Sequence, residues 1–167
     1  MIAAIFGLIE YLGHLKEVRI EKTLVFYEQF LKDPIFSSRT NILKKWELLD
    51  VKFAQLPKAN NNQEVITTNL KKCKEIVVTA LNNDALFTTD TDIMFGFFDS
   101  LQVCIENNIC DKKSAHELMQ DAAKIFFGNN CSYVAYVRFH KNIKNFGIKT
   151  EALADHSCNV ETYKEFV

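Results

Sequence analysis

The sequence predicts an all-α protein, a single-domain bundle of about five to six helices. Only 5 Gly and 2 Pro occur among 167 residues, and so few breaks favour long helices over many short strands. Hydrophobic residues make up 48% of the chain, enough for a buried core in a domain of this length. Phe is unusually frequent, at 14 residues, which indicates an aromatic core or interface.

The first helix is expected over residues 2–31, where apolar residues recur every three or four positions. Pro34 should end this helix, because proline disfavours helical backbone at the residue before it. We expect Ser37 or Ser38 to cap a second helix through its side-chain oxygen. The polar segment at 58–63 then indicates a surface loop.

A third helix is expected from Val65 to Leu81, again on helical spacing. The "NND" at 82–84 and the threonines at 88, 89 and 91 indicate a connection after it. We then expect a strongly apolar fourth helix that Asp90 or Asp92 caps. The fourth helix and the next one should form a helical hairpin at 92–127.

The stretch "CIENNICDKKSAHEL", residues 104–118, places Cys104, Cys110 and His116 at an even spacing of six. A structural zinc site needs four ligands, usually with local pairs two to four residues apart, and that spacing is missing. We therefore predict no metal site but a turn in which Asp111 caps the fifth helix. The core stripe predicted for this helix is Ala115, Leu118, Ala122, Ile125 and Phe126.

The bundle domain is expected to comprise residues 1–145, and the less periodic residues 146–167 to form a loosely packed C-terminal tail. The five cysteines are odd in number and scattered, and the start of the chain lacks the basic residues of a secretory signal. These features predict free thiols, no disulfide framework and a cytoplasmic location, with the cytoplasmic face of the membrane as a further possibility.

The charge balance and the motifs exclude several classes of function. With 20 basic and 21 acidic residues, no overall field favours nucleic acid, so no nucleic-acid partner is expected. "HELMQD" at 116–121 begins like a zinc-protease motif but has Gln120 where the second histidine is required. No glycine-rich phosphate loop or serine-nucleophile motif occurs. The sequence therefore predicts a non-enzymatic protein with no cofactor and no catalytic residue.

An alternative keeps an anionic-ligand site or an enzyme open. Arg19, Arg39, Arg138 and His140 are separated in sequence but could converge in the fold on a carboxylate or phosphate, which arginine binds in a bidentate manner. Solvated surface arginines or helix-end ion pairs are the ordinary alternative. The geometry of the four side chains decides between these interpretations.

Two segments resemble the bacterial domain-of-unknown-function family 4760. They are "RIEKTLVFYEQFLKDPIFSSRTNI" at 19–42 and "FFDSLQVCIENNICDKKSAHELMQDAAKIFFGNNCSYVAYVR" at 97–138. The resemblance implies a helical cytoplasmic domain, often behind a single membrane-spanning helix, and no established activity. The Trp common in the family's last helix is absent here. The family-like positions are Arg19, Thr23, Arg39, Phe97, Phe98, Leu101, Asp111, Tyr136 and Arg138.

Residues 1–15, "MIAAIFGLIEYLGHL", have three possible roles. They could begin a core helix, lie at a membrane surface, or be the relic of a family membrane anchor, since a spanning helix needs about 20 apolar residues. The lack of Lys and Arg before Lys16 disfavours anionic lipid. We expect core packing or self-association, with a homo-oligomer or a protein partner, and keep peripheral membrane contact as a third possibility. The expected interface residues are Ile2, Ile5, Phe6, Ile9 and Leu12.

Overall fold

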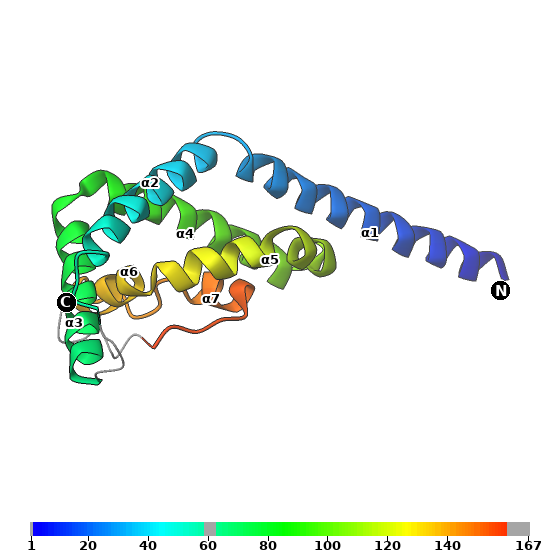
Figure 1. Ribbon diagram of the computed structural model, residues 1–167. Helices are drawn as coiled ribbons and strands as arrows, with labels where there is room; N and C mark the ends of the chain where they lie inside the picture. Colours follow the sequence, from blue (N-terminus) through cyan, green and yellow to red (C-terminus); the bar gives the residue numbers. More distant parts are fainter. Residues whose placement is uncertain (1, 59–62, 160–167) are drawn as a thin grey trace.

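The computed structural model is an all-helical bundle, which confirms the predicted fold class (Figure 1). It describes residues 2–58 and 63–159, and in that part of the chain no strand is present. The elements are α1 (Ile2–Phe30), α2 (Ile35–Phe53), α3 (Gln63–Asn83), α4 (Ala85–Glu106), α5 (Lys112–Asn129), α6 (Cys131–Ala135), the π-helical segment η1 (Tyr136–His140) and α7 (Ile148–Ala154).

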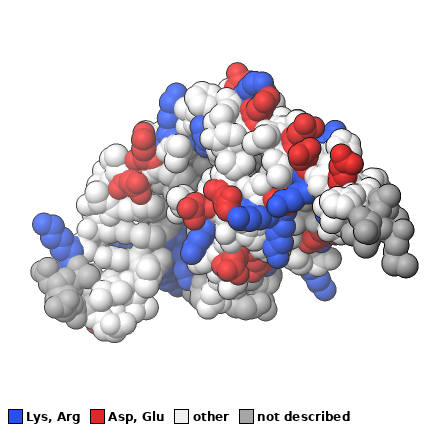
Figure 2. All heavy atoms as spheres, turned by 90° about the vertical axis from the view of Figure 1, so that its right-hand side faces the viewer, with Lys and Arg blue, Asp and Glu red and all other residues white. Residues whose placement is uncertain are grey.

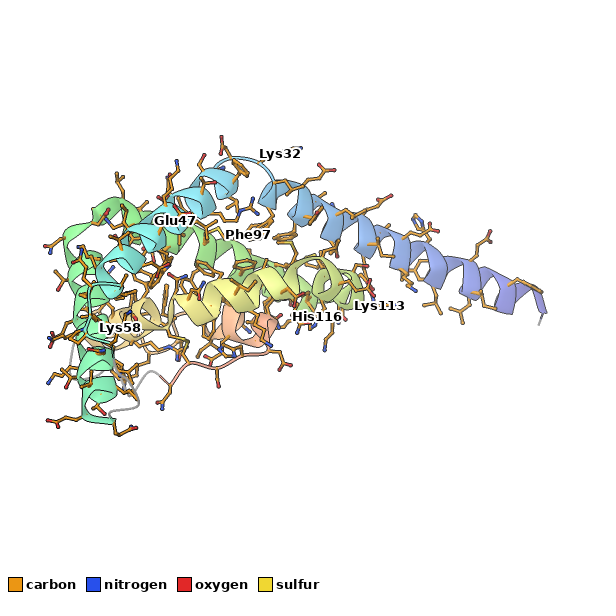
Figure 3. All side chains as sticks on the ribbon, in the orientation of Figure 1. Lys32, Glu47, Lys58, Phe97, Lys113 and His116 are labelled. Atoms are coloured by element: carbon orange, nitrogen blue, oxygen red, sulfur yellow. A yellow bond between two sulfur atoms is a disulfide. The ribbon has the colours of Figure 1, made fainter. Side chains whose placement is uncertain are left out.

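The apolar helix α4 forms the centre of the core and packs against α2 and α7. Its Phe98 and Leu101 are completely buried. Phe97 points from α4 toward the corner between α1 and α2 (Figure 3), where its ring lies 6.0 Å from that of Phe26 and 5.7 Å from that of Phe30. The high phenylalanine content therefore serves mainly an aromatic core within one chain.

Two predicted turns are confirmed by local chemistry. α1 ends at Phe30, before Pro34, and the Asp33–Pro34 peptide bond is cis. The Asp111 carboxylate accepts a hydrogen bond of 2.8 Å from the amide of Ser114, so this residue caps α5. Asn108, in the turn before it, has a φ of 55°, the left-handed conformation that asparagine tolerates.

The predicted caps of α2 and α4 are wrong. α2 begins at Ile35, and Ser37 donates its amide to the Asp33 carboxylate at 3.2 Å, so Ser37 lies inside the helix. The cap of α4 is Asp84, six residues before Asp90 and eight before Asp92, and its carboxylate accepts a hydrogen bond of 2.9 Å from the amide of Phe87. Asp90 and Asp92 are interior residues of α4.

The core stripe of α5 is also shifted from the predicted one. Ala115 and Phe126 are buried as expected, but Leu118 and Ile125 are exposed. Ala122 is only partly buried. α7 packs against one side of α5, which the sequence did not indicate. The residues of α5 that face α7 are therefore buried in place of some predicted ones. The additional fully buried residues of this helix are Met119, Ala123 and Phe127.

The predicted loose tail is packed against the bundle over the part that the structure describes, 146–159. Leu153 and Ala154 of α7 are buried, and the amide and hydroxyl of Thr150 donate to the Asp99 carboxylate of α4 at 2.7 and 2.6 Å. Gly147 begins this helix at a φ of +73°, with Phe95 so close that a Cβ would approach its ring to 3.1 Å. Residues 160–167 lie outside the described part.

The prediction of free thiols is wrong for four of the five cysteines. Cys104 and Cys110 form a disulfide across the turn between α4 and α5, and Cys131 and Cys158 form a second one. The second disulfide connects the start of α6 to the chain beyond α7, a separation of 27 residues. Cys73 remains a free thiol.

Candidate functional site

The N-terminal half of α1 is an apolar helix that projects beyond the bundle (Figure 1). Its described apolar side chains are uncovered, with 67% of Phe6, 61% of Ile9 and 55% of Leu12 exposed. Leu8 and Tyr11 are exposed to similar extents. The side chains of Ile2 and Ile5 lie outside the described part of the structure. Core packing of this segment, one of the two roles expected for it, is therefore wrong for residues 6–12.

The bundle supports α1 only in its C-terminal half. The backbone amide of Asp111 donates to the hydroxyl of Thr23 at 2.9 Å and to the carbonyl of Arg19 at 3.2 Å. Thr23 is completely buried at this contact. These hydrogen bonds hold α1 against the turn before α5, at the end of the bundle from which α1 projects. Lys113 and His116, on the first turns of α5, lie at the same end (Figure 3).

The three arginines of the predicted anionic site have separate surroundings. Arg138 on η1 donates to the Glu151 carboxylate at 3.0 Å and to the carbonyl of Phe146 at 2.9 Å, which fastens α7. The guanidinium of Arg39 stacks over the ring of Phe30 at 4.6 Å. Phe30 lies about 16 Å further along α1 than Arg19.

The convergence of Arg19, Arg39 and Arg138 on one ligand is therefore not formed in this structure. The side chain of His140, the fourth member of the predicted set, lies outside the described part. Arg138 serves the packing of the C-terminal segment, and Arg39 is the member that borders a cavity.

An apolar cavity of about 220 Å³ lies between α2 and α5, next to the C-terminal end of α1. Phe30, Met94 and Phe126 are buried residues of its wall. Arg39 is the one charged residue among those that line it, and no described carboxylate lies within ion-pairing distance of this guanidinium. The remaining lining residues are Ile42, Leu43, Trp46, Ala122, Ile125, Asn129 and Asn130.

Two polar atoms beside this cavity are buried without a hydrogen-bond partner in the described structure. They are Nε1 of Trp46 and Oδ1 of Asn130. Asn130 is 1% exposed, and its Nδ2 donates to the carbonyl of Phe126 at 2.8 Å, so only its oxygen is unpaired. Buried polar atoms are rarely left unpaired in proteins, which makes this wall unusual. Sequence reasoning missed the site because its residues come from four helices and the turn after α5.

Three of the described titratable groups with displaced pKa values belong to helix caps or to the core. A hydrogen bond from Lys45, followed by one from the Phe87 amide, lowers the pKa of Asp84. Hydrogen bonds from the Ser114 amide and hydroxyl lower the pKa of Asp111. Burial, and then the neighbouring Asp92, raises the pKa of Tyr133 far above its usual range, so this phenol stays a hydrogen-bond donor.

The disulfide across the α4–α5 turn joins Cys104 and Cys110, two of the residues weighed as metal ligands. The sulfurs of Cys104 and Cys110 are bonded to each other and so cannot serve as thiolate ligands in this state. Among the described residues, no group of three or more His, Cys, Asp and Glu side chains is placed to hold a metal ion.

Charged side chains of both signs are interspersed on the face that Figure 2 shows, with no broad region of a single sign. Within the described residues, no helix combines the length and the apolar character that a membrane span requires. No family model matches the chain, and no curated protein and no solved structure has significant similarity to it.

Proposed function

We propose that this chain is a non-enzymatic helical module that self-associates through the projecting half of α1, with a second copy of the chain as its partner. The observation that carries the proposal is the row of exposed apolar side chains at Phe6, Ile9 and Leu12. Contiguous apolar surfaces of several hundred Å² on soluble proteins mark interaction sites.

Two residues of the exposed row, Ile9 and Leu12, lie on the seam, the face by which α1 packs on its own bundle further along the helix. Thr23 and Phe30 are buried against the bundle, and Phe26 packs on Phe97. On the same seven-residue repeat, Ile9 lies fourteen residues before Thr23, and Leu12 fourteen before Phe26. Apolar residues at such positions pack helix against helix, and here Lys16 and Arg19 interrupt the repeat between the exposed segment and the part of α1 that packs on the bundle. A helical partner therefore fits the uncovered seam.

An antiparallel arrangement of the two copies suits the shape of the molecule. The bundle occupies the seam side of α1 from about Arg19 onward, so a parallel partner helix would bring two bundles into collision. Antiparallel helices that overlap over residues 2–15 leave the bundles at opposite ends of a contact about 21 Å long. This interface is smaller than a standard one, so association should depend on protein concentration.

The experiment is the solution mass of the full chain by light scattering, at several concentrations and without detergent. The 19.2 kDa chain should shift toward twice that mass as the concentration rises. Ile9→Glu with Leu12→Glu should hold the chain at the monomer mass, because it places carboxylates in the seam. Leu86→Glu is the matched control, since Leu86 is 77% exposed on α4 and should leave the mass unchanged.

A wild-type monomer at every concentration overturns the proposal. If the same monomer sediments with phospholipid vesicles and the double variant does not, the projecting half of α1 is a membrane-surface helix instead. The resemblance to family 4760, whose members often carry a membrane helix, motivates that comparison; it adds no activity to the proposal.

The disulfides support an oxidising compartment for this module, in place of the cytoplasmic location expected from the sequence. Reducing compartments keep most thiols free, whereas this fold pairs four of five cysteines. Alkylation before reduction should label one thiol, Cys73, and alkylation after reduction should label five. Five labelled thiols in the unreduced folded protein would contradict this assignment.

A further inference from the structure

We propose that the cavity between α2 and α5 binds a small monocarboxylic acid with an apolar body, whose carboxylate pairs with Arg39. This site is independent of self-association, since it borders the C-terminal end of α1 and not the projecting half. The ligand class follows from the size, the lining and the charge of the cavity.

The enclosed volume suits a ligand body of about eight to ten non-hydrogen atoms, and the cavity opens to solvent beside the exposed side chains of Leu43 and Ile125. A protein cavity of about 150 Å³ lined by aliphatic and aromatic side chains binds benzene, and this cavity measures about 220 Å³. Phe30, Met94 and Phe126 provide apolar walls that are buried whether or not a ligand is present. The body of the ligand is therefore a short hydrocarbon chain or a single ring.

The charge of the ligand follows from Arg39. Its guanidinium is partly buried, is held in place over the rings of Phe30 and Phe36, and has no carboxylate partner among the described residues. Stacking on an aromatic face leaves the edge of the guanidinium free to donate hydrogen bonds. A carboxylate accepts two such bonds from arginine in a charge-assisted, bidentate pair, whereas a neutral head group lacks the charge that strengthens them and a cation is repelled.

The wall of the cavity also contains two residues with unsatisfied polar atoms, Trp46 and Asn130. Both residues line the cavity, and each keeps one buried polar atom without a partner in the described structure. Leaving such atoms unpaired costs free energy of folding.

Trp46, the only tryptophan of the chain, lines this cavity and also a second pocket beside α3, so its fluorescence reports binding and the variants below locate it. Octanoate, used below its micelle concentration, should change the fluorescence of the full-length protein saturably. Octanol has the same chain without the charge and should bind at least about tenfold more weakly, since the charge-assisted hydrogen bonds are lost. This comparison needs no variant, so it tests the proposal even where a substitution disturbs folding.

Two variants and a control locate the site. Arg39→Gln should weaken octanoate binding about tenfold and leave octanol unchanged, whereas Lys44→Gln, an exposed charge on the same helix, should change neither. Ala122→Leu fills the cavity and should abolish the response to both probes. The proposal is overturned by a fluorescence that does not saturate, by equal affinity for octanoate and octanol, or by an Arg39→Gln protein that binds octanoate as tightly as the wild type.

Discussion

The two ends of the chain differ in burial, in the opposite sense to what their composition suggests. The projecting half of α1 is strongly apolar, yet Phe6, Ile9 and Leu12 are exposed. The C-terminal segment 146–159 has little helical periodicity, yet Leu153 is completely buried. Apolar composition alone therefore does not decide which segment the bundle covers.

The difference lies in specific anchors. The C-terminal segment is held by the Arg138–Glu151 ion pair, by the Asp99–Thr150 hydrogen bonds and by the disulfide at Cys158. The projecting half of α1 extends past the end of the bundle, and within the described part of the chain no other element covers its seam (Figure 1). It is free for a second molecule, and the predictions below test this contrast.

The largest effect should come from the disulfide that holds the C-terminal segment. Cys131→Ser with Cys158→Ser opens a loop of 27 residues and should lower the free energy of unfolding by about 3.5 kcal/mol. The same change at Cys104 and Cys110, separated by six residues, should cost about 2 kcal/mol. Urea unfolding of both variants measures this, and equal losses would contradict the loop-length argument.

Truncation of one leucine at each end should have unequal effects. Leu153→Ala leaves a cavity in the core and should cost about 3 kcal/mol. Leu12→Ala removes an exposed side chain and should change the stability of the monomer by less than about 0.5 kcal/mol. Thermal and urea unfolding at low protein concentration compare the two. A large loss in Leu12→Ala would mean that the bundle covers α1 in solution.

The anchor between α4 and α7 should contribute less than the core leucine. Asp99→Ala removes the acceptor of both Thr150 hydrogen bonds and should cost about 2 kcal/mol. Asp121→Ala removes an exposed carboxylate of α5 and serves as the control, with a change near zero. If both variants unfold at the same urea concentration, this anchor does not hold α7.

The cap at Asp111 should give the smallest effect, and a pH-dependent one. Its folded-state pKa is lowered, so the cap contributes fully above the ordinary carboxyl pKa of about 4 and loses its contribution as the pH falls through the folded pKa. Asp111→Ala should therefore cost about 1 kcal/mol at pH 7 and less at pH 2 to 3. Urea unfolding at both pH values tests this, and an unchanged gap between wild type and variant would argue against a charged cap.

The sequence predicted turns correctly where a single residue determines the local backbone conformation. Pro34 and Asp111 marked turns correctly because their effects extend over only a few neighbours. Asp84 was missed because the threonines after it suggested a connection, although in the fold Thr89 and Thr91 donate to helix carbonyls four residues earlier.

Features that depend on distant contacts could not be predicted in this way. α7 has only seven residues, too few for a helical repeat to be recognised, and its burial depends on Asp99 and Arg138 from other elements. The pairing of Cys131 with Cys158 follows from the fold and not from their spacing. The cavity at Arg39 likewise exists only once α1, α2, α4 and α5 are assembled.

Hydrogen–deuterium exchange at low and high protein concentration tests the contrast between the two ends most directly. The amides of residues 148–154 should be strongly protected at both concentrations, because their helix is anchored within one chain. Those of residues 6–12 should exchange rapidly at low concentration and gain protection as the second copy binds. Equal protection of residues 6–12 at every concentration, whether high or low, would contradict the account.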